Sequence, residues 1–336
     1  MSSLDRGSVF LQSKQRENAP ERIGKMERQR EFEIVQHTRM NLLEIFLVEM
    51  TSRGPHGHDD LEIGLILEGS LTLFIDQERH DLRTGDLYVI NRNQVHSFLN
   101  TRGRNRILAF QIHPDLYRRI DPRLAFLYLE NNIIRSGALY QHLRETLLAC
   151  AKVYFSPSDF RELKCFSLLF DALYQILTTA HCSFASGKAS AAARNNTHRL
   201  NRITDYVAEH FSDPLSLQDI AAQEHVTPCH LSHFMKNMIG ISLQEYLNQI
   251  RFEHALRLMD TTDLTLLDIC LETGFSSTRY LNRVFQKNLG CSAKEYRQAK
   301  EKPRLTGTAL PTDNIQRRSS YEQSALLLKK YLTAVS

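Results

Sequence analysis

Short runs of apolar, β-prone residues separated by turns dominate the chain between residues 41 and 113. Such runs occupy residues 43–48, 63–67, 71–75 and 107–112, and the triplets at 68–70 and 84–86 each contain a glycine typical of a turn. Many short strands joined by turns, with no long helical repeat among them, predict an antiparallel sandwich or barrel, a fold that can enclose a ligand.

Two long helical repeats follow, at about residues 138–154 and 159–181. Apolar residues of the second repeat recur at alternating spacings of three and four, and this stripe consists of Leu163, Phe166, Phe170, Leu173 and Leu177. The stripe predicts either packing onto the barrel or, because the same spacing suits a coiled-coil seam, part of a subunit interface. The pattern favours neither alternative over the other.

Changes in pattern divide the chain into five segments. A polar arm at 1–38 precedes the barrel and its helices at 39–182, and the small polar residues at 183–197 predict a flexible linker. Helical patterns resume at 198–300, and a tail at 301–336 contains an amphipathic run at 325–332 that either docks or frays. The expected fold class is therefore α+β with two domains, a β-barrel with flanking helices followed by an all-α domain.

Residues 215–247 and 264–297 repeat each other. Leu-Ser-Leu-Gln-Asp-Ile-Ala opens the first copy and Leu-Thr-Leu-Leu-Asp-Ile-Cys the second, and Gly, Ser, Glu and Tyr recur at the same spacing where each copy closes. Each copy contains two capping boxes, in which side chains satisfy free amides at a helix start. These boxes are Ser216/Asp219, Ser242/Glu245, Thr265/Asp268 and Ser292/Glu295.

A further helix start lies inside each copy. Thr227 suits an N-cap and Pro228 the first helical position, and Ser276 and Ser277 take this place in the second copy. Each copy then predicts a short helix, a tight turn at 225–226 or 274–275, and a second helix with a buried stripe, which is the anatomy of a helix-turn-helix unit. The residues expected in the two stripes are Leu231, Met235 and Met238, and Leu281, Phe285 and Leu289.

One continuous helix is predicted between the two units, at about residues 245–259. A rigid connector of this kind should place the units in successive major grooves, about one turn of DNA or ~34 Å apart. The second helix of each unit then enters the groove, where Arg pairs with guanine and Asn with adenine.

The candidate DNA-binding residues form the exposed arc of each second helix. They are Cys229, Ser232, His233 and Lys236 in the first copy, and Thr278, Arg279, Asn282, Arg283 and Lys287 in the second. Because Cys and Ser are weak readers of base edges, we expect the second copy to supply more of the sequence specificity.

Residues 198–300 resemble the DNA-binding domain of AraC/XylS-type regulators, most clearly in Gly-Phe-Ser-Ser-Thr-Arg-Tyr-Leu-Asn-Arg-Val-Phe-Gln-Lys at 274–287. The resemblance implies binding to double-stranded promoter DNA, activation through contact with RNA polymerase, and assembly as a homodimer. It also implies control by an N-terminal sensor domain that binds a small-molecule effector.

The first domain resembles the cupin barrels in two motifs. The first motif is Gly-Pro-His-Gly-His-Asp-Asp-Leu-Glu at 54–62 followed by Gly69, and the second is Gly85 followed by His96 and Asn100. Asn91 and Asn93 stand where cupins usually place Pro and Gly, so the turn geometry there should differ. The resemblance implies that four side chains converge inside the barrel, namely His56, His58, Glu62 and His96.

These four side chains have two candidate occupants. Members of this family commonly use the barrel as an effector pocket, often for sugars or related metabolites, and the same residues would then serve as hydrogen-bond donors and acceptors. Imidazole and carboxylate groups also suit a divalent metal such as Zn, Fe, Mn or Ni. We expect no cofactor, with a divalent metal as the alternative occupant.

Composition adds the cellular context of the chain. Its 336 residues are 42% hydrophobic and 24% charged, as in ordinary globular proteins, and no stretch has the ~20 apolar residues of a membrane span. Neither a signal peptide nor paired cysteines appear, so a cytoplasmic location with reduced thiols is expected. The net charge of +4 is weak evidence for nucleic acid binding, but residues 276–300 contain six basic side chains against one acidic side chain.

These observations predict a sequence-specific DNA-binding regulator, an activator rather than an enzyme, controlled by a small-molecule effector such as a sugar. The first alternative is a metal-dependent cupin enzyme with an appended DNA-binding domain. A second alternative is a DNA-binding module without an effector, controlled by abundance or by a protein partner.

Overall fold

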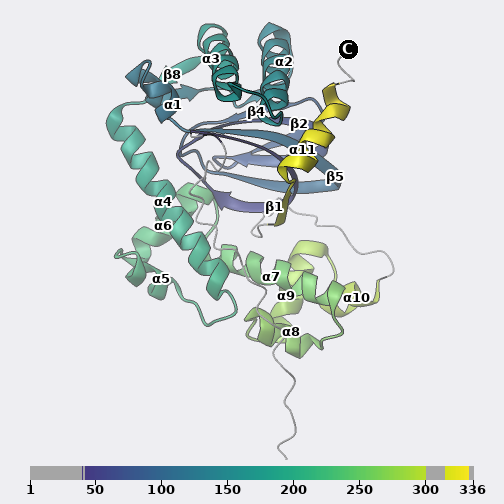
Figure 1. The fold of residues 1–336 in the computed structure, drawn as a ribbon. Coiled ribbons are helices and arrows are strands. Elements are labelled where there is room, and N and C mark those ends of the chain that lie inside the picture. The colour runs from purple at the N-terminus through teal and green to yellow at the C-terminus, as the bar shows by residue number, and fades with distance from the viewer. Residues whose placement is uncertain (1–39, 41, 300–314, 333–336) are drawn as a thin grey trace, which may run out of the picture. The chain divides into compact units, whose positions relative to one another are not determined.

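The computed structural model describes residues 40, 42–299 and 315–332 (Figure 1). The strands are β1 (Leu43–His56), β2 (Leu61–Ile75), β3 (Glu78–Arg83), β4 (Leu87–Ile90), β5 (His96–Ile112), β6 (Leu127–Leu129), β7 (Ile133–Ile134), β8 (Cys182–Phe184) and β9 (Ile315–Arg318). The helices are α1 (Asp115–Arg118), the 3-10 helix η1 (Pro122–Phe126), α2 (Gly137–Tyr154), α3 (Arg161–Thr179), α4 (Gly187–His210), α5 (Leu217–Gln223), α6 (Pro228–Ile239), α7 (Leu243–Thr261), α8 (Leu266–Thr273), α9 (Thr278–Leu289), α10 (Ala293–Gln298) and α11 (Tyr321–Leu332).

The sensor domain is built on one barrel-like sheet in the strand order β7-β4-β2-β5-β1-β9, with β3 also paired to β2. The long strands β1, β2 and β5 form its centre, and all of their mutual pairings are antiparallel. Each apolar run predicted as a strand lies in one of these three strands, so the prediction of an antiparallel barrel is confirmed. Two apolar clusters occupy the two sides of this sheet.

One predicted turn in the sheet is wrong. The triplet at 68–70 does not reverse the chain, because β2 continues through it with Gly69 at a φ of +79° and an irregular register against β5. A Cβ at Gly69 would lie 2.2 Å from the carbonyl O of Arg104, so the strands approach too closely there for a side chain. The chain reverses instead at Asp76 and Gln77, whose φ angles of 46° and 75° form a tight turn.

Helices α2 and α3 lie side by side over one face of the sheet (Figure 1). The buried side of α3 consists of Cys165, Leu169, Ala172, Leu173 and Ile176. Of the predicted stripe, only Leu173 lies on this side, whereas Phe166, Phe170 and Leu177 are half-buried and Leu163 is 71% exposed. Part of the stripe therefore packs onto the core of the sensor domain, as one of the two alternatives predicted, and its outer edge is left at the surface with the exposed Phe160 and Tyr174. The alternative of a subunit interface stays a prediction.

The prediction of a flexible linker at 183–197 is wrong. Residues 182–184 form β8, and α4 begins at Gly187 and runs without interruption into the DNA-binding domain. The sequence there is rich in alanine, the strongest helix former, and Ser186 caps the helix by accepting from the amide of Ala189. Small residues are often a sign of a flexible linker, but here the high helix propensity of alanine decides the structure, and the segment is helical.

Helix α4 also contacts the sensor sheet. The Asn201 side chain donates to the carbonyl O of Gly57 at 2.7 Å and accepts from its amide at 3.2 Å. The hydroxyl of Thr197 donates to the carbonyl O of Asn93 at 2.9 Å, and Val95 packs into the apolar core of the first helix-turn-helix unit. These contacts attach α4 to the residues that follow β1 and precede β5.

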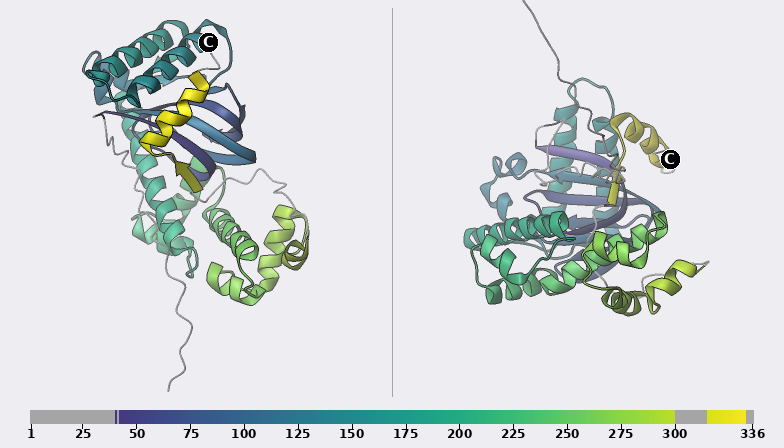
Figure 2. Two further views of the ribbon diagram at one scale, coloured as in Figure 1. Left: turned by 45° about the vertical axis from the view of Figure 1, so that its right-hand side comes forward. Right: turned by 90° about the horizontal axis from the view of Figure 1, so that it is seen from below.

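The tail docks on the sensor domain rather than fraying. Strand β9 pairs with β1 (Figure 2), and Leu328 of α11 is 2% exposed within an apolar cluster that also contains residues of α2 and α3. The amphipathic run predicted at 325–332 is thus the C-terminal part of a helix with a buried side.

Candidate functional site

The two helix-turn-helix units repeat in three dimensions as they do in sequence. All four predicted capping boxes are present, and the side chains of Thr227 and Ser277 cap α6 and α9. Between the helices, His225 and Gly274 take the same left-handed conformation, with φ angles of 55° and 73°. A Cβ at Gly274 would lie 2.7 Å from the carbonyl O of Ser212, which explains why the second unit uses glycine.

Burial follows the same pattern along α6 and α9. Residues 231–240 and 281–290 show identical sequences of buried, intermediate and exposed positions. Leu231, Met235, Leu281, Phe285 and Leu289 are buried as predicted. The prediction for Met238 is wrong, because this residue is only partly buried and Ile239 takes the position that corresponds to Leu289.

The predicted DNA-binding side chains lie on one exposed arc of each helix. Cys229, His233, Lys236, Arg279, Arg283 and Lys287 are exposed, and Ser232, Thr278 and Asn282 are half-buried. The guanidinium of Arg283 lies 6.0 Å from the centre of the Tyr280 ring. The exposed His230 of α6, which the sequence analysis missed, adds a donor beside Cys229.

Asn282 contributes to the fold as well as to the exposed arc. Its Oδ1 accepts from the amide of Ala293 at 2.9 Å, which joins α9 to the start of α10. Ser232 holds the corresponding place in the first unit, opposite Leu243. A serine side chain is shorter than an asparagine side chain, and a cavity of about 100 Å³ lies between α4, α5, α6 and α7.

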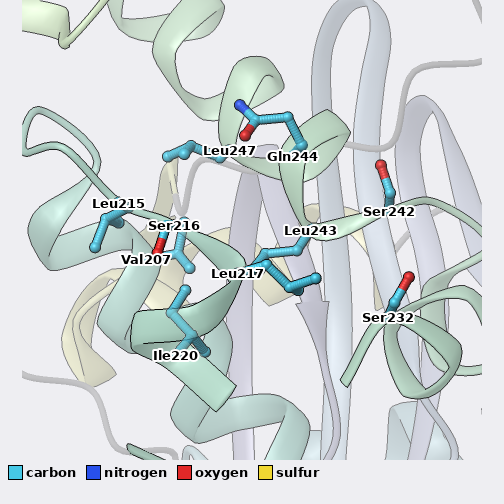
Figure 3. A pocket seen from close by; sticks show the side chains of 10 residues that line it. All are labelled: Val207, Leu215, Ser216, Leu217, Ile220, Ser232, Ser242, Leu243, Gln244 and Leu247. Atoms are coloured by element: carbon cyan, nitrogen blue, oxygen red, sulfur yellow. The ribbon is translucent and has the colours of Figure 1, made fainter. Parts of the chain in front are cut away.

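Figure 3 shows this cavity of the first unit. Its lining is mostly aliphatic, with the hydroxyls of three serines and one amide at its edge. The lining residues are Val207, Leu215, Ser216, Leu217, Ile220, Ser232, Ser242, Leu243, Gln244 and Leu247. The repeat therefore preserves the helices and their caps, while the first unit has a cavity beside Ser232, at the position where the second unit has the longer Asn282 side chain.

A second candidate site lies in the sensor domain, where His56, His58 and His96 converge. The ring centres of His56 and His96 are 4.1 Å apart, and those of His58 and His96 are 5.2 Å apart. His58, Glu62 and His96 are buried and each offers a ligand atom within 4.8 Å of the others. His56 packs its ring against His96, and its Nδ1 lies 2.8 Å from the carbonyl O of Gly54.

Hydrogen bonds orient the carboxylate of Glu62 at the centre of this cluster. Tyr88 donates its hydroxyl to Oε1 at 2.9 Å, and Gln111 donates its amide to Oε2 at 3.1 Å. Nε2 of His58 also lies 3.1 Å from Oε2. Burial and the adjacent Glu62 raise the pKa of Tyr88, so this hydroxyl keeps its proton.

The donor set of the cluster fits a cation. Nδ1 of His96 faces the carbonyl O of Gln94, so this Nδ1 carries a proton and Nε2 of the ring presents a lone pair. Nδ1 of His58 faces the carbonyl O of Asp60, and its Nε2 is hydrogen-bonded to Glu62, so a cation would take the place of the proton between these two side chains. Nε2 of His96 is buried and has no hydrogen-bond partner among the described residues. Burial, followed by the nearby His58, lowers the pKa of His96 to about 4, which keeps its ring neutral at physiological pH.

Space beside the cluster is small. A cavity of about 10 Å³ lies between His96 and the end of α6, with Met238 and Ile239 in its wall. His58 and Glu62 do not line this cavity, so its volume describes the edge of the cluster that faces the DNA-binding domain and not the space among the three ligand side chains.

Three members of the site escaped the sequence analysis. Tyr88 and Gln111 are polar residues within apolar strands, a signal that was available, and Gln111 lies directly across the sheet from Glu62. Arg53 is 7% exposed and close enough to act electrostatically on His96 and Tyr88. Its role depends on the register of β1, which no local pattern specifies.

The turn before β5 explains the departure from the second cupin motif. Asn93 adopts a φ of +58°, a left-handed conformation that asparagine tolerates better than most residues. Its side-chain amide donates to Asp59 at 2.9 Å, and Asn91 bonds the amide and carbonyl of Leu129. The two asparagines therefore form this turn without the usual Pro and Gly.

Comparison with protein families assigns both domains. A model described as an AraC-like ligand-binding domain matches residues 48–152, and one described as a helix-turn-helix domain matches residues 220–299. The chain belongs to the AraC/XylS family. This assignment confirms the resemblance on which the sequence analysis relied, and the α+β fold with a cupin-like barrel and two helix-turn-helix units agrees with it.

The individual relatives of this chain are distant from it in sequence. An uncharacterized HTH-type transcriptional regulator of Staphylococcus aureus strain MSSA476 is 24% identical over 247 residues, 73% of this chain and 32% of the relative. YijO of Escherichia coli K12, also an uncharacterized HTH-type regulator, is 32% identical over 129 residues, 37% of this chain and 46% of YijO. The chain thus spans about a third of the length of the first of these relatives.

Two solved structures also align with this chain. ToxT from Vibrio cholerae aligns over 80% of this chain and all of its own, with 14% identity and a TM-score of 0.35. The C-terminal domain of AraT from Geobacillus stearothermophilus aligns over 33% of this chain and 93% of its own, with 30% identity and a TM-score of 0.30.

Within the described ranges, none of the helices combines the length and the apolar character that crossing a membrane requires.

Exchanging the residues at positions 232 and 282 tests the packing difference between the units. Ser232→Asn should place an acceptor near the amide of Leu243 and fill the cavity, raising the free energy of unfolding by about 0.5–1.5 kcal/mol. Asn282→Ser should lower it by a similar amount, because the amide of Ala293 loses its acceptor. Urea denaturation of the two variants measures both effects, and a destabilising Ser232→Asn would show that the cavity cannot accept the longer side chain.

Proposed function

We propose that this chain is a transcription regulator that binds promoter DNA through both helix-turn-helix units under the control of its sensor domain. The observation that supports this most directly is the duplicated pattern of burial along α6 and α9, which leaves the same arc of each helix exposed. The side chains on this arc distinguish it from the solvated face of an ordinary bundle helix. In α9 that arc carries Arg279 and Arg283 near the N-terminal end, where recognition helices contact base edges.

The connector helix sets the distance between the units. Helix α7 has 19 residues and therefore spans roughly 28 Å. Asn248 in this helix donates to the hydroxyl of Tyr280 at 2.7 Å, and Arg251 donates to the carbonyl oxygens of Phe211 and Asp213 in the first unit. Because α7 is bonded to both units, it fixes the spacing of the two recognition helices, which we expect to match about one turn of DNA.

Selection of binding sites from a random DNA library tests this function. With the full-length protein at stated salt, we expect a motif of two contacted blocks about one turn apart. Arg283→Ala should cost about 1–3 kcal/mol on the selected site and relax the preference at one base pair. Arg83→Ala, which removes an exposed arginine from β3 of the sensor domain, is the matched control and should leave both properties unchanged.

Two outcomes would change the assignment. A loss of equal size on random DNA would make Arg283 a phosphate contact rather than a base reader. Failure to enrich any sequence would remove the support for specific DNA binding. Activation by contact with RNA polymerase is the part of the proposal that rests on the family resemblance alone.

A homodimer is the proposed assembly, with the outer edge of α3 as its interface. Phe160, Leu163 and Tyr174 are 84%, 71% and 62% exposed, and the half-buried Phe166 and Phe170 lie between them. Large apolar side chains that gather on one exposed helix edge mark an interaction surface. A symmetric pairing of α3 helices would cover this edge with an identical one from a second copy.

Placing charges on this edge tests the dimer. Leu163→Glu combined with Tyr174→Glu should raise the dissociation constant of the dimer by about tenfold or more, because each new carboxylate would lose its hydration in the interface. Gln175→Glu adds a charge beside this edge and serves as the control. Sedimentation equilibrium measures the constants, and unchanged dimerisation of the double variant would exclude this face.

For the sensor site, we propose that the occupant is a divalent cation rather than a sugar. The proposal is supported by the buried, unpartnered Nε2 of His96 and by the placement of His58, Glu62 and His96, which each offer a ligand atom within 4.8 Å of the others. Two imidazole nitrogens and one carboxylate suit a borderline cation such as Zn²⁺ or Ni²⁺. Tyr88 and Gln111 would orient the carboxylate by the bonds they already make.

Removal of the carboxylate charge tests the cation site. Glu62→Gln should weaken Zn²⁺ binding by about tenfold or more, because it replaces an anionic ligand with a neutral amide. The control is His142→Ala, which removes a histidine of α2. This histidine bonds Asp171 of α3, and neither residue belongs to the cluster. Isothermal titration of full-length protein with Zn²⁺ measures both variants, and equal affinities would show that any bound metal lies elsewhere.

The same samples distinguish the two remaining alternatives. Metal-dependent turnover of a substrate that His58→Ala abolishes would favour a cupin enzyme with an appended DNA-binding domain. Sequence-specific DNA binding that neither Zn²⁺ nor a thermal-shift screen of sugars and metabolites alters would favour a module controlled by abundance or by a protein partner.

A further inference from the structure

The last described segment of the chain belongs to the sensor domain, although it follows the DNA-binding domain in sequence. Strand β9 pairs antiparallel with β1, with Val48 opposite Arg318, Glu49 opposite Arg317 and Met50 opposite Gln316. The amide of Ser319 extends this ladder by donating to the carbonyl O of Leu47 at 2.8 Å. Figure 2 shows β9 and α11 (yellow) against the sheet in two views.

Helix α11 is packed as part of the core. Leu328 and Ser324 are 2% and 1% exposed, and Leu328 belongs to the apolar cluster that also contains the buried sides of α2 and α3. Polar bonds hold both ends of the helix. Tyr321 donates its hydroxyl to the carbonyl O of Tyr154 at 3.1 Å, and Tyr331 donates to Glu68 at 3.0 Å.

Side chains of β9 bind β1 as well. The guanidinium of Arg318 lies 4.0 Å from the centre of the Phe46 ring, a cation–π contact. Arg53 donates to the side chain of Gln316 at 3.4 Å. Arg53 is a buried cation near His96, so the docked segment reaches the surroundings of the sensor site through this side chain.

We propose that residues 315–332, called the strap below, complete the sensor domain by adding a strand to β1 of the same chain. The DNA-binding domain is then an insertion within the sensor domain and not an appendage at its end. Its N-terminal side is attached where Asn201 holds Gly57, directly after β1, and its C-terminal side where β9 pairs with β1. Two attachments leave the inserted domain fewer orientations than one attachment would.

The strap also covers an interaction surface. Strand β1 pairs with β5 on one side and with β9 on the other, so without the strap the backbone groups of its outer side from Val48 to Ser52 would be open. An open strand edge readily pairs with another strand. Release of the strap thus offers β1 to a second copy of the chain, and the docked strap directs self-association away from this edge.

Cleavage of the full-length protein between the DNA-binding domain and the strap tests the proposal. A protease recognition sequence replaces residues 304–310, and the cut protein is passed through a native gel-filtration column. The strap fragment should elute with the body of the protein, because strand pairing and the burial of Leu328 hold it without the covalent link. Separate elution of the fragment in native buffer would overturn the proposal.

Two variants of α11 make the test specific. Leu328→Asp buries a charge and should weaken fragment retention by about tenfold or more. Leu326→Asp introduces the same charge on the same helix at a residue that is 66% exposed, and it should retain the fragment as the parent does. Equal release from both variants would contradict the packing described for α11.

A third variant and a mixing experiment cover the remaining outcomes. Ser319→Pro removes the amide that donates to Leu47 and should speed hydrogen exchange at Val48–Ser52 of β1 by about tenfold, without placing a charge in the core.

In a mixture of differently tagged uncut chains, docking within one chain predicts no concentration-dependent exchange of straps. Capture of one chain's strap by another would overturn docking in the same chain, and self-association of Ser319→Pro through β1 would support the shielding role.

Discussion

Strand β1 is the element on which the rest of the structure depends, because both of its edges must be hydrogen-bonded. Its inner edge pairs with β5, and its outer edge pairs with β9, which the chain supplies only after the whole DNA-binding domain. Its end contributes His56 to the sensor cluster and leads into Gly57, which Asn201 of α4 holds by two hydrogen bonds. One strand therefore connects the sheet, the sensor site and both attachments of the DNA-binding domain.

The repeated units show which features the fold requires and which it leaves free. Both units contain capping boxes, a left-handed turn and buried stripes. These features recur because the caps satisfy free amides at the helix starts and the stripes fill the core of each unit. The exposed arcs differ, with Cys229 in one unit at the place of Arg279 in the other. Packing differs where Ser232 replaces Asn282, since one side chain reaches the next helix start and the other does not.

Sequence patterns predicted the features that depend on interactions between residues close together in the chain. Capping residues identified the starts of α5 to α10, and apolar runs identified the long strands, because each signal lies within a few residues of the structure it produces. The docking of β9 escaped prediction because it joins residues more than 260 positions apart. The bulge at Gly69 and the helical start of α4 were misassigned because glycine and alanine each have two local interpretations that only tertiary contacts separate. Of the sensor site, the motif residues were found, but Tyr88, Gln111 and Arg53 depend on strand register.

The packing of the sensor barrel limits how a signal can leave the site. Apolar side chains fill the barrel around the polar cluster, so a ligand as large as a sugar would have to displace buried residues such as Phe98 or Ile75. The cation proposed above would need no such displacement, because His58, Glu62 and His96 already place one ligand atom each within 4.8 Å of the others. Its binding would act first on His58 and His96, the neighbours of Gly57 and Val95. Because Gly57 is bonded to α4 and Val95 packs in the first unit, these two contacts are the route by which a shift of the cluster would reach the DNA-binding domain.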